Sequence, residues 1–139
     1  MVQYVSAILE ATWITPSGEQ VRLVVEGLGH EALMSWFPRI PDCVRRVDLV
    51  GLLVASAATL LGETPQKGGE LVPISFHIEA VLVEEGMQQR FEILLFRDDK
   101  GFHARPPGSP AKIITLVRDY LTRALPLDRA VDEYSEEER

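Results

Sequence analysis

The sequence lacks paired cysteines, a long hydrophobic run and the pattern of an N-terminal leader. Cys43 is the single cysteine, which excludes an intramolecular disulfide and a cluster of thiolate metal ligands. The main uncharged run, residues 49–62, has 14 residues, short of the roughly 20 that a membrane-spanning helix needs. These absences exclude a disulfide-stapled secreted module and a helix that spans a membrane.

The start of the chain and its cysteine usage both favour the cytoplasm. The first ten residues, MVQYVSAILE, have neither the positive start nor the unbroken apolar block of a signal peptide. A lone thiol also suits a reducing compartment. We therefore expect a cytoplasmic protein that does not associate with membranes.

The residues that are present suffice for one compact domain. Of the 139 residues 46% are hydrophobic, and a chain of this length can fold without a metal or a disulfide. The formal net charge is −7, of which residues 128–139 contribute −4 through six acidic and two basic side chains. We expect a single α+β domain over residues 1–127, followed by a mobile acidic tail over residues 128–139.

The N-terminal segment predicts a β-hairpin. Apolar side chains alternate over residues 5–13 and again over residues 21–25, on either side of the turn cluster TPSGE. A turn that pairs Thr15 with Glu19 places Trp13 opposite Val21 and collects the apolar residues of both strands on one face.

Two helices are predicted in the middle of the chain. Residues 30–37 carry apolar side chains at helical spacing, and prolines follow that would end a helix. Residues 49–61 follow Asp48, a favoured N-cap, and end at Gly62. This second helix is apolar nearly all round, so we expect it to be buried on most sides. Alternatively, its small residues allow a close helix pairing across a homodimer interface, through Gly51, Ala55 and Ala58.

A second hairpin is predicted later in the chain. Alternating apolar residues over 74–82 and 91–95 flank a two-residue turn, and the resulting register pairs Ala80 with Phe91. A DDKG turn then allows residues 102–105 to return as a fifth strand.

The last predicted element is a helix over residues 109–125. Ser109 is a favoured N-cap, and Pro110 suits the first helical position. The predicted fold is therefore α+β: an antiparallel sheet of four to five strands, a hairpin plus a three-strand meander, with about three helices packed mainly on one face.

One group of side chains on the second hairpin has the composition of a ligand set. In the predicted register His77 and Glu79 share the outer face, and Glu79 lies directly opposite Glu92. Opposed carboxylates repel and can recruit a cation, and a neighbouring imidazole would complete the set. In the alternative interpretation this is an ordinary solvated face, on which Arg90 lies diagonally and relieves the repulsion.

The sequence contains no recognisable catalytic motif. No serine lies in a G-x-S-x-G pattern, Cys43 has no histidine near it, and the H-E-x-x-H pattern is absent. The glycines at 27 and 29 lack the third glycine and the context of a phosphate-binding loop. We therefore predict no catalytic residues, no cofactor and no bound metal.

A basic stretch offers a candidate binding site. Residues 97–123 hold six Lys or Arg against three Asp, a net of +3, and begin with RDDKGFHARPPGSPAK. Cations beside an aromatic ring can hold phosphates and stack a base. In one interpretation this basic strip contacts nucleic acid or another polyanion through Arg97, Lys100, Phe102, His103, Arg105 and Lys112. In the alternatives the same residues contact a protein partner, or they form an ordinary charged loop that keeps the domain soluble.

A second candidate binding surface lies in residues 34–46, MSWFPRIPDCVRR. Tryptophan and arginine are favoured anchors of protein interfaces. The candidate anchors are Trp36, Phe37, Arg39, Arg45 and Arg46. In the alternative, the two aromatic residues cap the core and the arginines face water.

Three function classes remain open. The first is a non-catalytic interaction module, an adaptor, chaperone-like or regulatory protein that docks on a larger protein and can form a homodimer. The second is a binder of nucleic acid or another polyanion, and the third is a small enzyme that uses His77, Glu79 and Glu92. Because the acidic chain disfavours phosphate binding and no catalytic motif is present, we predict the first class.

Overall fold

The computed structural model describes residues 2–44, 48–63 and 71–125. The acidic segment 128–139 lies outside these ranges, as do Arg45 and Arg46. In chain order the elements are β1 (Val2–Ile14), β2 (Gln20–Glu26), a 3-10 turn (Gly29–Glu31), β3 (Leu33–Phe37), a second 3-10 turn (Asp42–Val44), α1 (Leu49–Leu60), β4 (Val72–Glu84), β5 (Met87–Asp98), β6 (Gly101–Arg105) and α2 (Pro110–Arg123).

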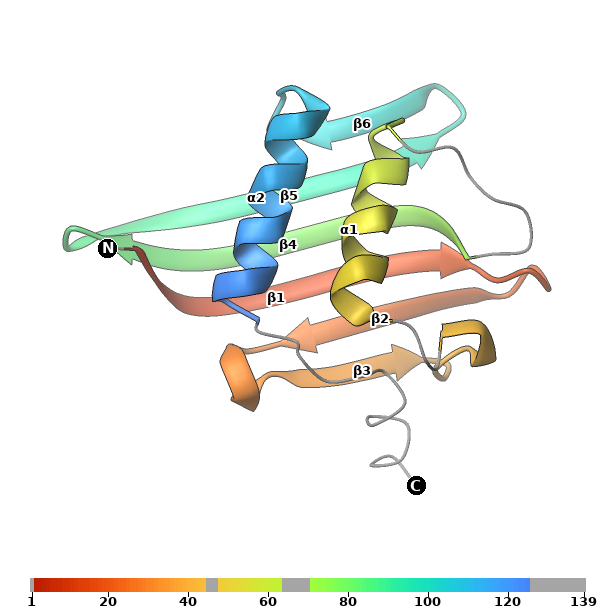
Figure 1. Ribbon diagram of the computed structural model, residues 1–139, viewed down its shortest axis with the longest axis horizontal. Coiled ribbons are helices and arrows are strands. Elements are labelled where there is room, and N and C mark those ends of the chain that lie inside the picture. The colour runs from red at the N-terminus through yellow and green to blue at the C-terminus, as the bar shows by residue number, and fades with distance from the viewer. Residues whose placement is uncertain (1, 45–47, 64–70, 126–139) are drawn as a thin grey trace.

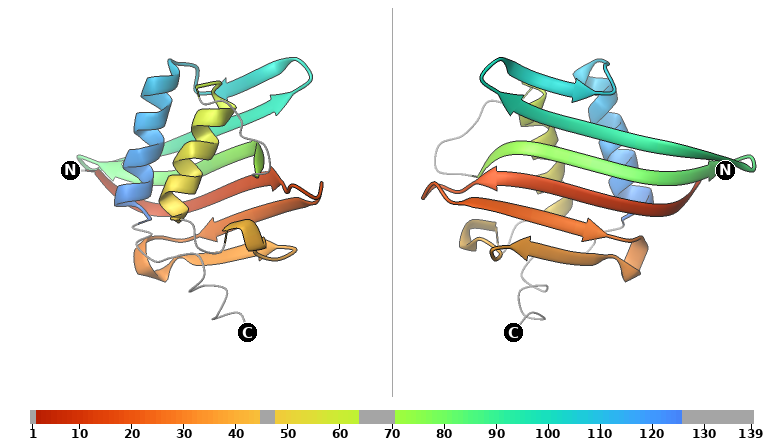
Figure 2. Two further views of the ribbon diagram at one scale, coloured as in Figure 1. Left: turned by 45° about the vertical axis from the view of Figure 1, so that its right-hand side comes forward. Right: turned by 180° about the vertical axis from the view of Figure 1, so that it is seen from behind.

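The six strands form one antiparallel sheet in the order β3-β2-β1-β4-β5-β6. Both α-helices lie side by side on one face and cross the strands in opposite directions (Figure 1). Seen from behind, the other face is open, and neither helix covers it (Figure 2). The α+β prediction, with helices on one face, is therefore confirmed.

The sheet is built from two similar halves. Each half is a three-strand meander followed by one helix: β1 to β3 with α1, then β4 to β6 with α2. The halves join through a long antiparallel pairing of β1 with β4, in which Leu9 lies opposite Ile78. Both side chains are fully buried, so the seam between the halves forms the centre of the core.

The predicted registers of both hairpins are confirmed. Trp13 lies opposite Val21, and Thr15 donates its backbone N–H to the carbonyl of Glu19 at 2.8 Å. In the second hairpin Ala80 lies opposite Phe91. In each case alternation of apolar residues and a short turn select the same register, because a slip by one residue would expose the whole apolar set. The expected fifth strand is β6.

The predicted helix over residues 30–37 is wrong. A 3-10 turn over Gly29–Glu31 is followed by the edge strand β3, which pairs with β2. In β3 the side chain of Trp36 faces the core, whereas Leu33 and Phe37 are 72% and 48% exposed. The hydrogen-bonding edge of β2 offers this segment backbone partners, which outweighs an apolar spacing that also fits a helix. Among the residues that the structure describes, the sheet therefore has six strands rather than four to five, and two α-helices rather than about three pack against it.

The two remaining helices begin as predicted. The carboxylate of Asp48 accepts the backbone N–H of Gly51 at 3.1 Å, and the Ser109 hydroxyl accepts that of Lys112 at 3.3 Å. The expected burial of α1 on most sides is largely confirmed, because six of its twelve residues are buried and four more are partly buried. Its outer residues Gly51 and Ala55 are exposed, because α2 lies beside α1 and leaves this surface uncovered.

The core joins the sheet to α1 through a pair of tryptophans. Trp13 is fully buried, and its ring stacks on Trp36 with centroids 5.6 Å apart. The indole N–H of Trp13 donates to the hydroxyl of Ser56 on α1 at 2.9 Å, which satisfies a polar group that would otherwise be buried without a partner.

Tyr120 on α2 packs between Tyr4 and Phe91, with centroid distances of 5.7 and 6.1 Å. Its hydroxyl is buried and has no hydrogen-bond partner among the residues described. Burial, and secondarily the nearby Tyr4, raises the pKa of the Tyr120 phenol above its ordinary value. The buried phenol therefore keeps its proton at a pH at which the phenol of an unfolded chain ionises.

The Tyr120→Phe variant tests this environment. At neutral pH its free energy of unfolding is expected to be unchanged or higher by roughly 1 kcal/mol, because the change removes an unpaired buried hydroxyl. As the pH rises through about 10, the wild type loses stability because only the unfolded phenol ionises, and by about pH 10.5 the variant should lose about 1 kcal/mol less. Urea unfolding at the two pH values measures this difference. An equal loss in both proteins would contradict the raised pKa.

Candidate functional surfaces

A groove runs between α1 and α2 on the helical face. It encloses about 860 Å³ and has one wall from each helix, with Glu63 beyond the end of α1. Its lining is mainly small and apolar: Val50, Gly51, Val54, Ala55 and Ala58 on α1, and Ala111, Ile114, Thr115, Arg118 and Thr122 on α2.

The outer side of α1 has almost no polar side chains that can hydrogen-bond with water. The sequence of the helix, LVGLLVASAATL, contains no charged residue. Its two hydroxyls turn back onto the helix: Ser56 donates to the carbonyl of Leu52 at 2.7 Å and Thr59 to that of Ala55 at 3.0 Å. By contrast, α2 is amphipathic and carries an ion pair between Arg123 and Asp119 at 3.0 Å on its exposed side. An exposed uncharged helix face of this kind is typical of a docking surface.

The groove carries opposite charges toward its two ends. Glu63 follows the C-terminal end of α1, and both Glu63 and Arg118 are exposed. Because α1 and α2 run in opposite directions, Arg118, in the second half of α2, lies toward the other end of the groove. The lining of the groove is therefore mainly apolar, with one acidic side chain at one end and one basic side chain toward the other.

The open face of the sheet carries the second candidate site. The register places Glu79 on β4 directly opposite Glu92 on β5, as the sequence predicts. Donor atoms of His77, Glu79 and Glu92 all lie within 4.8 Å of one another. The imidazole Nε2 of His77 is 3.3 Å from Oε2 of Glu92.

Two arginines neutralise the opposed carboxylates. Arg90 pairs with Glu79, as the diagonal placement predicts, and Nη1 of Arg105 lies 3.8 Å from Oε1 of Glu92. Both arginine side chains are largely exposed, at 76% and 71%. The repulsion between the carboxylates is therefore relieved by long side chains that remain in contact with water.

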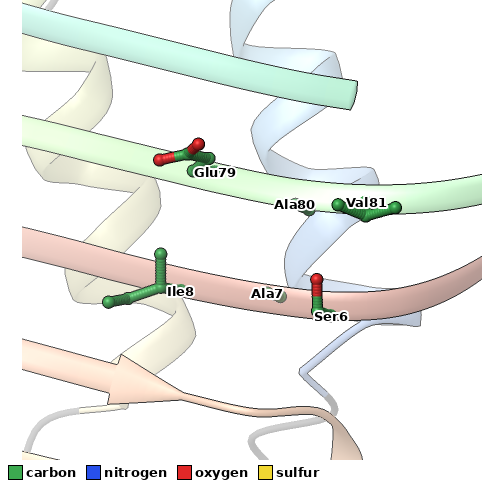
Figure 3. Close-up of a pocket in the computed structure, with 6 residues that line it drawn as sticks. All are labelled: Ser6, Ala7, Ile8, Glu79, Ala80 and Val81. Carbon is green, nitrogen blue, oxygen red and sulfur yellow. The ribbon is translucent and has the colours of Figure 1, made fainter. Parts of the chain in front are cut away.

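A shallow depression borders this group of side chains at the β1–β4 seam. It encloses about 250 Å³ next to Glu79, and its outward side chains come from Ser6 and Ile8 on β1 and from Val81 on β4 (Figure 3). The register of β1 against β4 shifts between Tyr4 and Ser6. The hollow is small and mainly apolar, and it lies beside the Glu79 carboxylate.

The basic strip is divided between different parts of the molecule. Arg97 and Phe102 lie across from each other on the helical side of the β5–β6 hairpin, with the guanidinium 4.5 Å from the ring centroid. His103 points to the open face, stacks on Phe96 at 4.6 Å and pairs with Asp98 at 2.9 Å. Arg105 also points to the open face, whereas Lys100 lies in the β5–β6 turn and Lys112 in the first turn of α2. These cations do not form one continuous surface.

The candidate anchors in residues 34–46 are also divided. Trp36 is buried, whereas Phe37 on the open face of β3 is exposed beneath the guanidinium of Arg22, 5.2 Å from the ring centroid. Arg39 is exposed after the strand ends. Phe37 and Arg39 therefore remain available to a partner, and Trp36 belongs to the core.

The amino-acid sequence indicates one wall of the groove and not the other. The small residues of α1 were visible as a stripe, but Ala111, Ile114 and Thr115 on α2 gave no separate signal. The sequence signal that could have indicated the groove is the contrast between α1, which has no charged residue, and α2, which is amphipathic and of similar length.

Comparison of the chain with protein-family models, curated proteins and solved structures finds no match. Within the residues described, no helix combines the length and the apolar character needed to cross a membrane.

Proposed function

We propose that the protein is a non-catalytic interaction module that works as a homodimer, with the groove between α1 and α2 as its self-association surface. The observation that carries this proposal is the uncharged, exposed outer side of α1. Since the free energy falls when apolar side chains leave water, this surface favours a bound apolar partner.

A second copy of the chain suits the groove in shape and in charge. The outer face of α1 carries the small exposed residues Gly51 and Ala55, which allow a second backbone to approach closely. A twofold axis across the groove would bring Glu63 of each copy toward Arg118 of the other. This arrangement is self-complementary, as a twofold interface requires.

The dimer would leave both open sheet faces and the edge strands for a larger protein partner. Leu33 and Phe37, exposed on edge strand β3, are apolar contacts for such a partner. The division of the basic strip between different parts of the molecule favours this function over a polyanion-binding one.

The Ala55→Glu variant tests the groove as the interface. The substitution places two like charges near the twofold axis, so the dimer association constant is expected to fall by about a hundredfold or more. Sedimentation velocity over a range of protein concentrations measures the change. Ala104→Glu on β6 is the matched control, because it puts the same side chain on an exposed position outside the groove.

Charge reversal tests the orientation of the two copies. Glu63→Arg alone should weaken the dimer, and Glu63→Arg combined with Arg118→Glu should restore it, because the double variant inverts both ends of the groove. A wild type that stays monomeric over the whole concentration range, or an Ala55→Glu variant that dimerises normally, would refute the proposal.

A further inference from the structure

We propose that His77, Glu79 and Glu92 form a binding site for a divalent transition-metal ion such as Zn²⁺ on the open face of the sheet. The site lies on the face opposite the α1–α2 groove, and the proposal does not depend on dimerisation.

The spacing of the donor atoms fits such an ion. Ligands at about 2.1 Å from a tetrahedral zinc ion lie about 3.4 Å from one another. His77 Nε2 and Glu92 Oε2 are already 3.3 Å apart, and the Glu79 carboxylate completes a set within 4.8 Å. A small rotation of the Glu79 side chain would therefore bring all three groups to bonding distance.

The backbone beneath the site is anchored in the core. His77 and Glu79 flank Ile78 on β4, and Glu92 precedes Ile93 on β5; both isoleucines are fully buried and lie opposite each other. The alternation of a strand thus anchors the ligand positions through core side chains on the other face. Ligands carried by a packed sheet are better preorganised than ligands on a loop.

Breaking the existing ion pairs costs little free energy. Arg90 and Arg105 pair with the two carboxylates, but each guanidinium is largely exposed, and a surface ion pair contributes about 0.2–1 kcal/mol. An ion bound by three ligands replaces both contacts and also removes the repulsion between the opposed carboxylates.

The donor set favours zinc over magnesium or calcium. An imidazole nitrogen is a good ligand for zinc, nickel and copper, whereas magnesium and calcium require oxygen ligands in larger number. Three protein ligands on an exposed face would leave a fourth position for water or a small ligand.

Zinc titration of the full-length chain without a polyhistidine tag tests the site. A chromophoric chelator reports competition for Zn²⁺, and the visible absorption of Co²⁺ reports the ligand geometry. We expect one ion per chain, and a loss of at least about tenfold in affinity in His77→Ala and in Glu79→Gln with Glu92→Gln.

Two further variants separate this site from weak surface binding. His103→Ala is the matched control, because His103 also pairs with a carboxylate, Asp98, but lies outside the three-ligand cluster; its zinc affinity should be unchanged. Arg90→Gln with Arg105→Gln should bind zinc more tightly, because both carboxylates lose their competing partners. Circular dichroism without metal confirms that each variant is folded.

Absence of saturable zinc binding up to about 1 mM would overturn the proposal. Undiminished binding in His77→Ala would also overturn it, and so would equal affinity for Mg²⁺, which would indicate an acidic patch. The same titration on Ala55→Glu separates the two proposals: zinc binding should survive in that variant whether or not the dimer does.

Discussion

Trp13→Ala is expected to lower the free energy of unfolding by about 3–5 kcal/mol, which is a large part of the stability of a domain of this size. Trp13 is fully buried and holds three elements together. It extends from β1, stacks on Trp36 of β3 and donates a hydrogen bond to Ser56 of α1. Its removal leaves a cavity between the sheet and the helix.

Urea unfolding followed by circular dichroism measures the loss. Trp13→Phe is the matched variant: it keeps an aromatic ring beside Trp36 but loses the N–H donor and the volume of the second indole ring. Ser56 still donates to the carbonyl of Leu52, so its hydroxyl keeps one partner. We expect Trp13→Phe to retain most of the free energy of unfolding that Trp13→Ala loses. A cost below about 1 kcal/mol for Trp13→Ala would contradict this packing.

The second large effect is expected from a pair of neighbours on β5 that face opposite sides of the sheet. Ile93 is fully buried under the helices, whereas Leu94 is half-buried on the open face. Ile93→Ala should therefore cost about 2–5 kcal/mol, and Leu94→Ala no more than about 1 kcal/mol.

This pair of variants tests whether the open face stays open in solution. The free energy of unfolding of both is measured at two protein concentrations. Leu94→Ala could instead lower the free energy of unfolding as much as Ile93→Ala does, with a larger loss at the higher protein concentration. A second molecule would then cover the open face of the sheet rather than the helices. That result would move the dimer interface from the groove to the open face.

Local sequence alone predicts much of the fold, because its signals agree with one another. In both hairpins the turn and the alternation select one register, as the pairing of Trp13 with Val21 shows. The helix starts at Asp48 and Ser109 follow from side chains that accept hydrogen bonds from N–H groups three residues later. The group formed by His77, Glu79 and Glu92 was predictable for the same reason, since it depends only on the register of one hairpin.

Residues 30–37 show where local pattern fails. Their apolar spacing fits a helix and also fits a short strand with Trp36 facing inward. What decides between the two is the free edge of β2, to which this segment supplies the missing backbone hydrogen bonds. A short apolar segment carries too little information to select its own partner.

The chain by itself determined the two hairpins, the ends of the helices and the charged cluster on β4 and β5, because each depends on residues close together in sequence. Only the tertiary structure decided that β1 pairs with β4, which joins two meanders into one sheet. That pairing places α1 beside α2 on a single face and so creates the groove. Its walls come from helices about 50 residues apart in sequence, and such contacts form only when the closure of a long loop is offset by burial of a shared core.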